Sequence, residues 1–188
     1  MERLSIGGQM PDFTYQTPFE KNCVFSKTVQ SGSPLTIVLF HRFYGCRLCK
    51  YDLRCFAEKY DILQNHGMQM LAAVQSAPAS LAEQLRGSNY PFSIICDPSG
   101  TLYDKFEILP AESREVMLGK IEQEKMDAIR RLGLEHGADE GNPLQLPAIF
   151  VVDSKLIIRY VHYGTTAGDV PSPDTLVNVF SAKQHHVF

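Results

Sequence analysis

The chain has 188 residues and a formal net charge of −3, with 44% hydrophobic and 21% charged residues. These values are typical of one globular domain, so we expect a single domain over residues 1–188. Lysine and arginine do not gather in a block, which gives no reason to expect nucleic acid or an anionic membrane as a partner. No apolar run approaches the ~20 residues of a membrane-spanning helix, and the first residues contain no long apolar stretch. We therefore expect a cytoplasmic protein.

The first long element is a strand predicted over Leu35–Phe40, where apolar and β-branched residues form a continuous run. Before it, Gly and Pro residues interrupt residues 1–34, which are expected to form loops with short strand fragments. After it, a helix is predicted because apolar residues recur at steps of four and three on one face: Cys49, Leu53, Phe56, Tyr60 and Leu63. His66-Gly67 is expected to end this helix.

Strand and helix patterns continue to alternate along the chain. Strands are predicted over Met68–Gln75 and Phe92–Cys96, with short helices over Leu81–Leu85 and Thr101–Phe106. An insertion at residues 111–142 is predicted to hold a charged amphipathic helix over 111–136, in which Lys125 interrupts the apolar side. A hairpin (146–153 and 156–161) and a last helix (173–182) follow. This order predicts an α/β fold with a central mixed sheet and helices on both faces.

Cys46 and Cys49 form a Cys-x-x-Cys motif between the predicted strand and helix, a position that indicates redox chemistry. Cys46 is expected at the first turn of the helix, where unpaired backbone N–H groups and the helix dipole stabilise a thiolate. Positive residues nearby favour the same ionisation: His41, Arg42, Arg47 and Lys50. Cys49 begins the apolar face, so we expect it to be the more buried of the two. It would serve as the resolving thiol, which attacks a mixed disulfide or sulfenic acid on Cys46.

Two structural alternatives exist for this motif, a pair of core cysteines or half of a zinc site. A zinc site needs two more ligands, whereas the chain has no second Cys-x-x-Cys, and His185-His186 stand far along the chain. We therefore predict no metal ion and no cofactor. The other cysteines are expected to pack in the helix (Cys55), to fill a buried strand position (Cys96), or to lack a placed partner (Cys23). A remote resolving role for Cys23 is a minor alternative.

With Cys-x-x-Cys at the end of the first long strand and Pro147 opening the late hairpin, the sequence resembles thioredoxin-fold proteins. It resembles more closely the alkyl hydroperoxide reductase/thiol-specific antioxidant (AhpC/TSA, peroxiredoxin-like) family. The resemblance covers nearly the whole chain, through residues 8–13, 37–49, 95–100 and 146–160. It implies a thioredoxin-like fold in which Pro147 is in the cis form and faces the active cysteine. The backbone of Leu146 would then be a docking surface for a substrate chain.

The resemblance also implies an antioxidant oxidoreductase. Its Cys46 thiolate would attack a peroxide and become a sulfenic acid, Cys49 would condense with it, and an external dithiol such as thioredoxin would restore the pair. Groups expected to support the reaction are the arginines that would stabilise the leaving oxygen and a nearby phenol: Arg42, Arg47, Arg159 and Tyr44. Family members are often dimeric, so a homodimer is one candidate assembly.

The sequence departs from this family next to the first cysteine. Peroxiredoxins carry a Thr or Ser three residues before the peroxidatic cysteine and a proline further upstream, but here that position is Phe43 and the proline is missing. The motif also differs from the Trp-Cys-Gly-Pro-Cys of thioredoxin, and the chain has no tryptophan. Two substrates therefore stay open for the same cysteines, a peroxide, or a protein or small-molecule disulfide. A third alternative is a non-enzymatic redox-sensing domain that binds a partner through the helix at 111–136.

Overall fold

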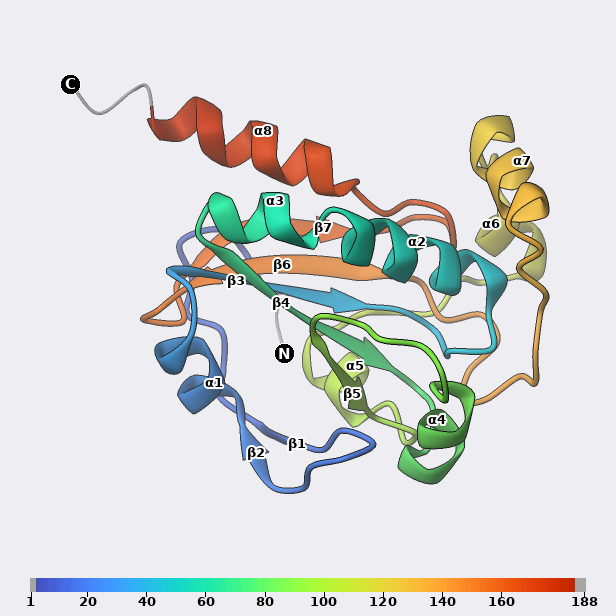
Figure 1. Cartoon of the computed structure of the whole chain (residues 1–188), viewed down its shortest axis with the longest axis horizontal. Coiled ribbons are helices and arrows are strands. Elements are labelled where there is room, and N and C mark those ends of the chain that lie inside the picture. Colours follow the sequence, from blue (N-terminus) through green and yellow to red (C-terminus); the bar gives the residue numbers. More distant parts are fainter. Residues whose placement is uncertain (1–2, 185–188) are drawn as a thin grey trace.

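The computed structural model describes residues 3–184, and a five-stranded sheet forms its centre (Figure 1). The strand order is β5-β4-β3-β6-β7, and the strands are β3 (Leu35–Phe40), β4 (Met68–Val74), β5 (Ser93–Cys96), β6 (Ala148–Asp153) and β7 (Ile158–Tyr163). Strands β3, β4 and β5 run parallel, whereas β6 is antiparallel to β3 and β7 is antiparallel to β6. A separate small sheet pairs β1 (Thr14–Tyr15) with β2 (Cys23–Val24). The predicted mixed sheet and late hairpin are confirmed.

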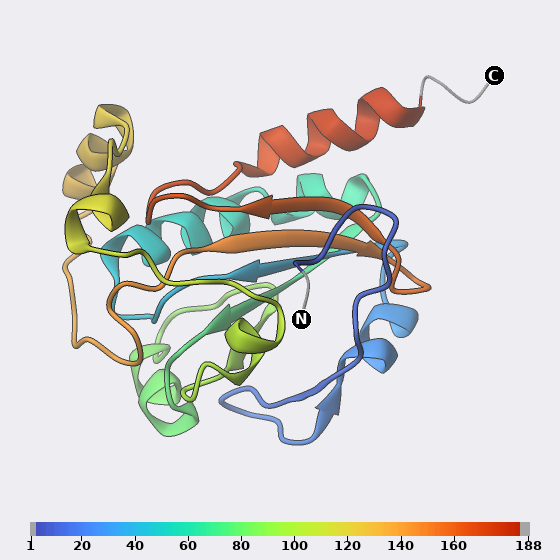
Figure 2. The same cartoon turned by 180° about the vertical axis from the view of Figure 1, so that it is seen from behind.

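Helices cover both faces of the sheet, as predicted. One face carries α2 (Arg47–Glu58), α3 (Tyr60–Asn65), α4 (Pro78–Gln84) and α8 (Pro173–Gln184). The other carries α1 (Phe25–Ser31), α5 (Thr101–Lys105) and the N-terminal segment, which Figure 2 shows from behind. Successive side chains of a strand point to opposite faces. Ile37 and Leu39 of β3 therefore enter the first core, which lies under α2, α3, α4 and α8. Val38 and Phe40 enter the second core, which lies under α1, α5 and the N-terminal segment.

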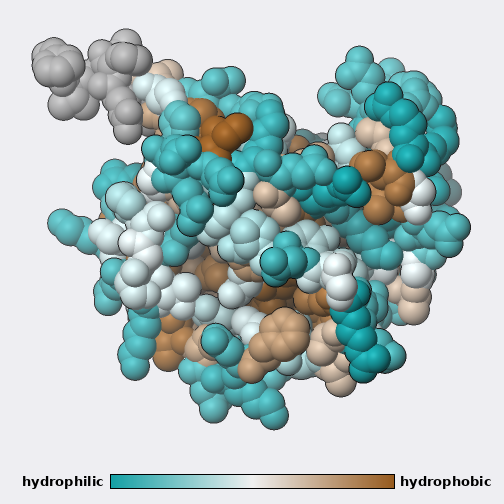
Figure 3. Space-filling model, viewed as in Figure 1, coloured by the Kyte–Doolittle hydropathy of each residue, from teal (hydrophilic) through white to brown (hydrophobic). Residues whose placement is uncertain are grey.

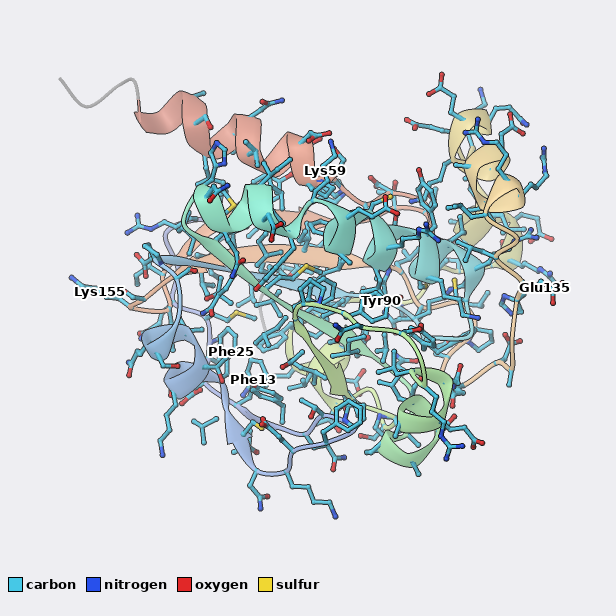
Figure 4. All side chains as sticks on the ribbon, in the orientation of Figure 1. Phe13, Phe25, Lys59, Tyr90, Glu135 and Lys155 are labelled. Atoms are coloured by element: carbon cyan, nitrogen blue, oxygen red, sulfur yellow. The ribbon has the colours of Figure 1, made fainter. Side chains whose placement is uncertain are left out.

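Helix α1 was not predicted, although it completes the second core. Its residues Phe25 and Val29 are buried one turn apart, and the Phe25 ring stacks on Phe13 with centroids 4.5 Å apart (Figure 4). The N-terminal segment is fixed beside this core by backbone hydrogen bonds from Met10 to Leu156 (2.8 Å) and from Ile158 to Gly8 (2.9 Å). Two apolar residues in seven are too weak a pattern to predict a helix from the sequence.

Two predicted helices are divided in the structure. The helix expected over 111–136 is instead α6 (Arg114–Leu118) and α7 (Gln123–Arg131), because Gly119 between them has φ +42°, a conformation that ends a right-handed helix. The helix that follows Cys49 is interrupted at Lys59, which separates α2 from α3. The Lys59 ammonium bonds to Asp174 of α8 at 2.6 Å, so this break faces a neighbouring helix (Figure 4).

The expected cis form of Pro147 is wrong, since the described part of the chain contains no cis peptide bond. The trans form is the default for a bond before proline, by about 0.5–1 kcal/mol. Pro147 is nevertheless buried at the start of β6, and its carbonyl accepts a hydrogen bond from Gly164 (2.9 Å).

The surface seen in the orientation of Figure 1 is mostly hydrophilic, with hydrophobic side chains in small separate patches (Figure 3). Within residues 3–184, no helix has both the length and the apolar character that crossing a membrane requires. His185 and His186, the remote zinc-ligand alternative, lie outside the described residues.

Candidate active site

Cys46 lies at the N-terminus of α2, as the sequence predicts. The chain leaves β3 at Phe40, turns through residues 41–45, and begins α2 directly after Cys46, which is the N-cap residue. In this position the Cys46 Sγ accepts a hydrogen bond from the backbone N–H of Cys49 at 3.4 Å. An N-cap side chain satisfies one of the unpaired N–H groups of the first turn, and a thiolate does so better than a thiol.

Arg42 binds the Cys46 sulfur directly. Its Nη2 donates to Cys46 Sγ at 2.9 Å, and its Nη1 donates to Met117 Sδ (2.9 Å) and to the carbonyl of Pro143 (2.7 Å). The two contacts of Nη1 fix the plane of the guanidinium. Arg42 and Cys46 are both buried, so their attraction is screened less than it would be in water.

The two cysteines have opposite protonation preferences. A hydrogen bond from the Cys49 thiol, the positive charge of Arg42 and the Cys49 backbone N–H lower the pKa of Cys46, although burial opposes this shift. Burial, together with the adjacent negative sulfur, raises the pKa of Cys49 well above the ordinary value. The arrangement therefore favours a Cys46 thiolate and a Cys49 thiol, the pattern expected of an attacking cysteine and a resolving cysteine.

The sequence predicts that Cys49 is the more buried of the pair, but both cysteines are buried in the structure. Cys46 is 0% exposed and Cys49 is 2% exposed, because the insertion at 111–142 covers the N-terminus of α2. Helices α6 and α7 stand at the end of the sheet where α2 begins (Figure 1). Their buried residues Met117 and Ile129 join the two cysteines and Phe43 in one hydrophobic cluster. The apolar side of the insertion therefore packs against the redox motif.

The segment that returns from α7 to β6 closes over the loop before Cys46. Glu135 in Figure 4 lies on this segment, and the backbone N–H of Gly137 donates to the carbonyl of Gly45 at 2.8 Å. A Cβ at position 45 would lie 2.3 Å from the carbonyl oxygen of Ala138, so glycine permits the close approach. Glu140 anchors the same segment by accepting hydrogen bonds from Ser76 and Ser80 of the β4–α4 region.

Two further predicted residues, Leu146 and Tyr44, pack in different hydrophobic clusters. Leu146 packs against the cluster that contains Cys46, and its carbonyl accepts a hydrogen bond from the Gln145 side chain (3.2 Å). Tyr44 belongs to the core on the other side of the loop, where its hydroxyl lies 3.3 Å from that of Tyr90 (Figure 4). Tyr90 is on the segment before β5, on the side of the sheet that α2 covers (Figure 4).

The structure does not bring Arg159 to this site. Its guanidinium pairs with Asp153 at 2.6 Å, and Asp153 lies opposite Leu35 at the start of β3. Cys46 follows the other end of β3, where Phe40 pairs with Ala148. Because β6 and β7 run antiparallel to each other, a residue near the start of β7 lies beside the end of β6, and Arg159 is therefore one strand length from Cys46.

A buried polar group lies next to the cysteines and was not predicted. The Asp52 carboxylate of α2 binds the Lys125 ammonium of α7 through Oδ1 at 2.6 Å, while its Oδ2 lies 3.8 Å from Nε2 of His41. Neither Asp52 Oδ2 nor His41 Nε2 has a hydrogen-bond partner. Burial raises the pKa of Asp52 to about 7 despite the positive charge of Lys125. Burial and the charges of Lys125 and Arg42 lower the pKa of His41 to about 3.

The sequence does contain signals for this pair. Asp52 follows Cys49 by three residues and so lies on the inward face of its helix, and Lys125 interrupts the apolar side of the insertion. A charge on each of two apolar faces indicates that the faces meet. A cleft of about 980 Å³ opens beside the pair between α2, α7 and the segment after β7, with Asp52 and Lys125 in its wall. Among the residues from 3 to 184, no group of three or more His, Cys, Asp and Glu side chains is placed to hold a metal ion.

Comparisons with known proteins agree with this architecture. The model of the AhpC/TSA family matches residues 6–161. Among solved structures, the chain is similar to the reduced 2-Cys peroxiredoxin of Plasmodium vivax (TM-score 0.68, 12% identity, 96% of this chain and 82% of that chain). It is also similar to a variant of peroxiredoxin 6 of Arenicola marina (0.71, 14%, 96% and 74%) and to the peroxidoxin BcpB of Mycobacterium tuberculosis (0.66, 11%, 99% and 99%). These structures share the thioredoxin-like fold. No curated protein sequence matches the chain significantly.

Proposed function

Since this chain belongs to the AhpC/TSA family and is an oxidoreductase, we propose that it reduces peroxides with Cys46 as the attacking thiolate and Cys49 as the resolving thiol. The observation that carries the proposal is the Cys46 sulfur itself. It accepts hydrogen bonds from the guanidinium of Arg42 at 2.9 Å and from a backbone N–H of the first helical turn at 3.4 Å. Both contacts favour the thiolate, the form that attacks an O–O bond.

In the first step, the Cys46 thiolate attacks one peroxide oxygen. An S–O bond forms, the O–O bond breaks, and the second oxygen leaves as hydroxide or alkoxide and takes up a proton to become water or an alcohol. Arg42 is placed to stabilise the negative charge on the departing oxygen, because its Nη2 already contacts the sulfur. In the second step, Cys49 attacks the Cys46 sulfenic acid, water leaves, and the two sulfurs form a disulfide.

The burial of Cys46 favours a peroxide over a protein disulfide as the substrate. An exchange reaction needs the attacking sulfur to reach a disulfide on another chain, whereas Cys46 is covered by Met117 and Ile129 of the insertion. A small oxidant needs much less space. Phe43 replaces the hydroxyl residue of peroxiredoxins with an apolar ring that lies 5.3 Å from the Arg42 guanidinium, so Arg42 is the polar group that remains to orient the peroxide.

The disulfide would be reduced by an external dithiol of the thioredoxin type, which reaches the sulfur atoms only when the insertion moves aside. Such a cycle requires a reducing compartment such as the cytoplasm, where thiols are kept reduced. The five cysteines are all free in the structure, which is the state that starts the cycle. A homodimer is compatible with this chemistry and is not needed for it, since Cys46 and Cys49 lie on one chain.

The test is rapid mixing of the reduced protein with hydrogen peroxide, followed by mass mapping of the oxidised cysteines. We expect fast oxidation that ends in a Cys46–Cys49 disulfide, no turnover for Cys46→Ser, and a persistent sulfenic acid for Cys49→Ser. Cys55→Ser is a matched control, because Cys55 is half-buried on the same helix outside the pair. Oxidation of Cys46 no faster than that of a free thiol would contradict the proposal and direct attention to disulfide substrates.

A further inference from the structure

Asp52 is a buried carboxylate with one oxygen that no hydrogen bond satisfies. An acceptor left unpaired in an apolar environment destabilises the folded protein. We propose that Asp52 accepts the proton of the Cys49 thiol when Cys49 attacks oxidised Cys46, and returns it when the disulfide is reduced. The inference rests on the proposed Cys46–Cys49 disulfide and extends it to the proton that the disulfide step must move.

The position of Asp52 fits this role. Asp52 follows Cys49 by one helical turn on α2, and side chains three residues apart have Cβ atoms about 5–6 Å from each other. Both are buried, at 6% and 2% exposed. The ammonium of Lys125 holds Oδ1 at 2.6 Å and is itself fixed by the carbonyl of Gly168 (3.1 Å). This contact leaves Oδ2 as the free acceptor on the interior side, where it lies 3.8 Å from His41.

Cys49 needs such an acceptor because its thiol is hard to ionise. Burial and the Cys46 thiolate raise its pKa, yet only the thiolate attacks sulfur effectively. The charged and titratable groups around Asp52 are Lys125 from α7, His41 from the end of β3, Cys46 from the preceding loop, and Tyr51 and Cys55 on α2 itself. Lys125 is a cation, and the lowered pKa of His41 makes it a weak base. Asp52 is the remaining base, and a pKa near 7 suits both acceptance and return of a proton.

The cleft beside Asp52 gives the proton a route to solvent. Asp52 and Lys125 line it together with His162 and Asp169, which pair with each other at 2.8 Å. Asp52 therefore lies between a sealed sulfur pair and a polar opening. Neither Cys46 nor Cys49 lines that cleft.

The steps balance in both directions. During oxidation, the Cys49 S–H bond breaks, Asp52 takes the proton, the S–S bond forms, and the Cys46 S–O bond breaks. The departing hydroxide takes a proton from solvent and becomes water, while Asp52 keeps the proton that came from Cys49. During reduction by a dithiol, a donor thiolate attacks the Cys46 sulfur to form a mixed disulfide, the Cys46–Cys49 bond breaks, and Cys49 leaves as a thiolate that receives a proton from Asp52. The second thiol of the donor then attacks the donor sulfur of the mixed disulfide, which releases Cys46 as a thiolate and leaves the donor oxidised.

The experiment measures reduction of the disulfide form, made with diamide so that no peroxide is involved. The rate of disulfide reduction by dithiothreitol is measured at each pH. It is divided by the fraction of dithiothreitol present as thiolate, and the result is plotted against pH. We expect the wild-type rate to fall through an inflection at or below pH 7, as Asp52 loses the proton that it donates, because the disulfide form lacks the Cys46 thiolate that helps to raise the pKa of Asp52. In Asp52→Asn the inflection should disappear and the rate below pH 7 should drop at least about tenfold. Asp52→Glu should restore part of the inflection and part of the rate below pH 7.

Two further variants make the test specific. Glu58→Gln removes an exposed carboxylate from the same helix and should leave the profile unchanged. Lys125→Met removes the cation that lowers the pKa of Asp52, so it should move the inflection to higher pH, and it serves if Asp52→Asn does not fold. A wild-type profile in Asp52→Asn, or an unmoved inflection in Lys125→Met, would overturn the proposal. If peroxide does not oxidise the protein, the peroxidase proposal fails while this result still decides the role of Asp52.

Discussion

Replacement of Arg42 should show how much of the acidity of Cys46 comes from one buried charge. The Nη2 atom lies 2.9 Å from the sulfur, and since the guanidinium charge is delocalised, its centre is about 4 Å away. Two unit charges at that distance attract by about 4 kcal/mol at an effective dielectric constant of 20. Since 1.36 kcal/mol corresponds to a tenfold change, Arg42→Met should weaken the ionisation of Cys46 by up to about a thousandfold. The hydrogen bonds from Cys49 remain and favour the thiolate still.

The assay is the pH dependence of Cys46 alkylation by iodoacetamide, followed by mass spectrometry so that the other cysteines are separated. Arg42→Met should move the midpoint to higher pH, whereas Arg42→Lys keeps a cation and should move it less. Arg47→Met is the matched control, because Arg47 lies on the same first turn but is exposed to solvent, which screens its charge. An alkylation midpoint equal to that of the wild type in Arg42→Met would refute the electrostatic reasoning.

Two further predictions concern stability. Gly45→Ala places a Cβ 2.3 Å from the carbonyl oxygen of Ala138, so we expect a loss of about 1–3 kcal/mol in urea unfolding and faster alkylation of Cys46 as the insertion is displaced. An unchanged free energy of unfolding together with an unchanged alkylation rate of Cys46 would show that the backbone shifts easily to relieve the contact with Ala138. For Asp52, the folded-state pKa is about 7 against an ordinary value of 3.8, so its stabilising effect is complete below about pH 3.8 and lost as the pH rises through 7. The free energy of unfolding should fall less steeply over that range in Asp52→Asn, and equal slopes in both proteins would contradict the burial of this carboxyl.

Local patterns were sufficient for the part of the site that is contiguous in sequence. The run at 35–40, the Cys-x-x-Cys motif and the apolar face that begins at Cys49 predict a strand, a helix N-terminus and an inward sulfur, and the structure contains all three. Arg42 belongs to the same group, because four residues separate it from Cys46. Such features follow from side-chain period and helix geometry alone.

Contacts between distant segments were beyond these patterns. Met117 is 75 residues from Arg42, and nothing in the spacing of either residue indicates that a thioether would meet the guanidinium. The burial of Cys46 likewise depends on how the insertion folds back, which Gly119 and Gly45 decide through backbone conformation and close approach. Arg159 was assigned to the site from the family resemblance, and the antiparallel register of β6 and β7 places it at the opposite end. Register is a property of strand pairs, so one strand cannot specify it.

The cover that the insertion forms over Cys46 has a kinetic consequence. Because Cys46 has no exposed surface, we expect it to react only in conformations in which α6 or the segment at 137–145 has moved aside. At low oxidant concentration, closing is faster than reaction, and the observed rate is the intrinsic rate multiplied by the fraction of open molecules. At high concentration, each opening leads to reaction, and the rate levels off at the opening rate itself. The oxidant concentration at the plateau thus separates the reactivity of the sulfur from the motion that uncovers it.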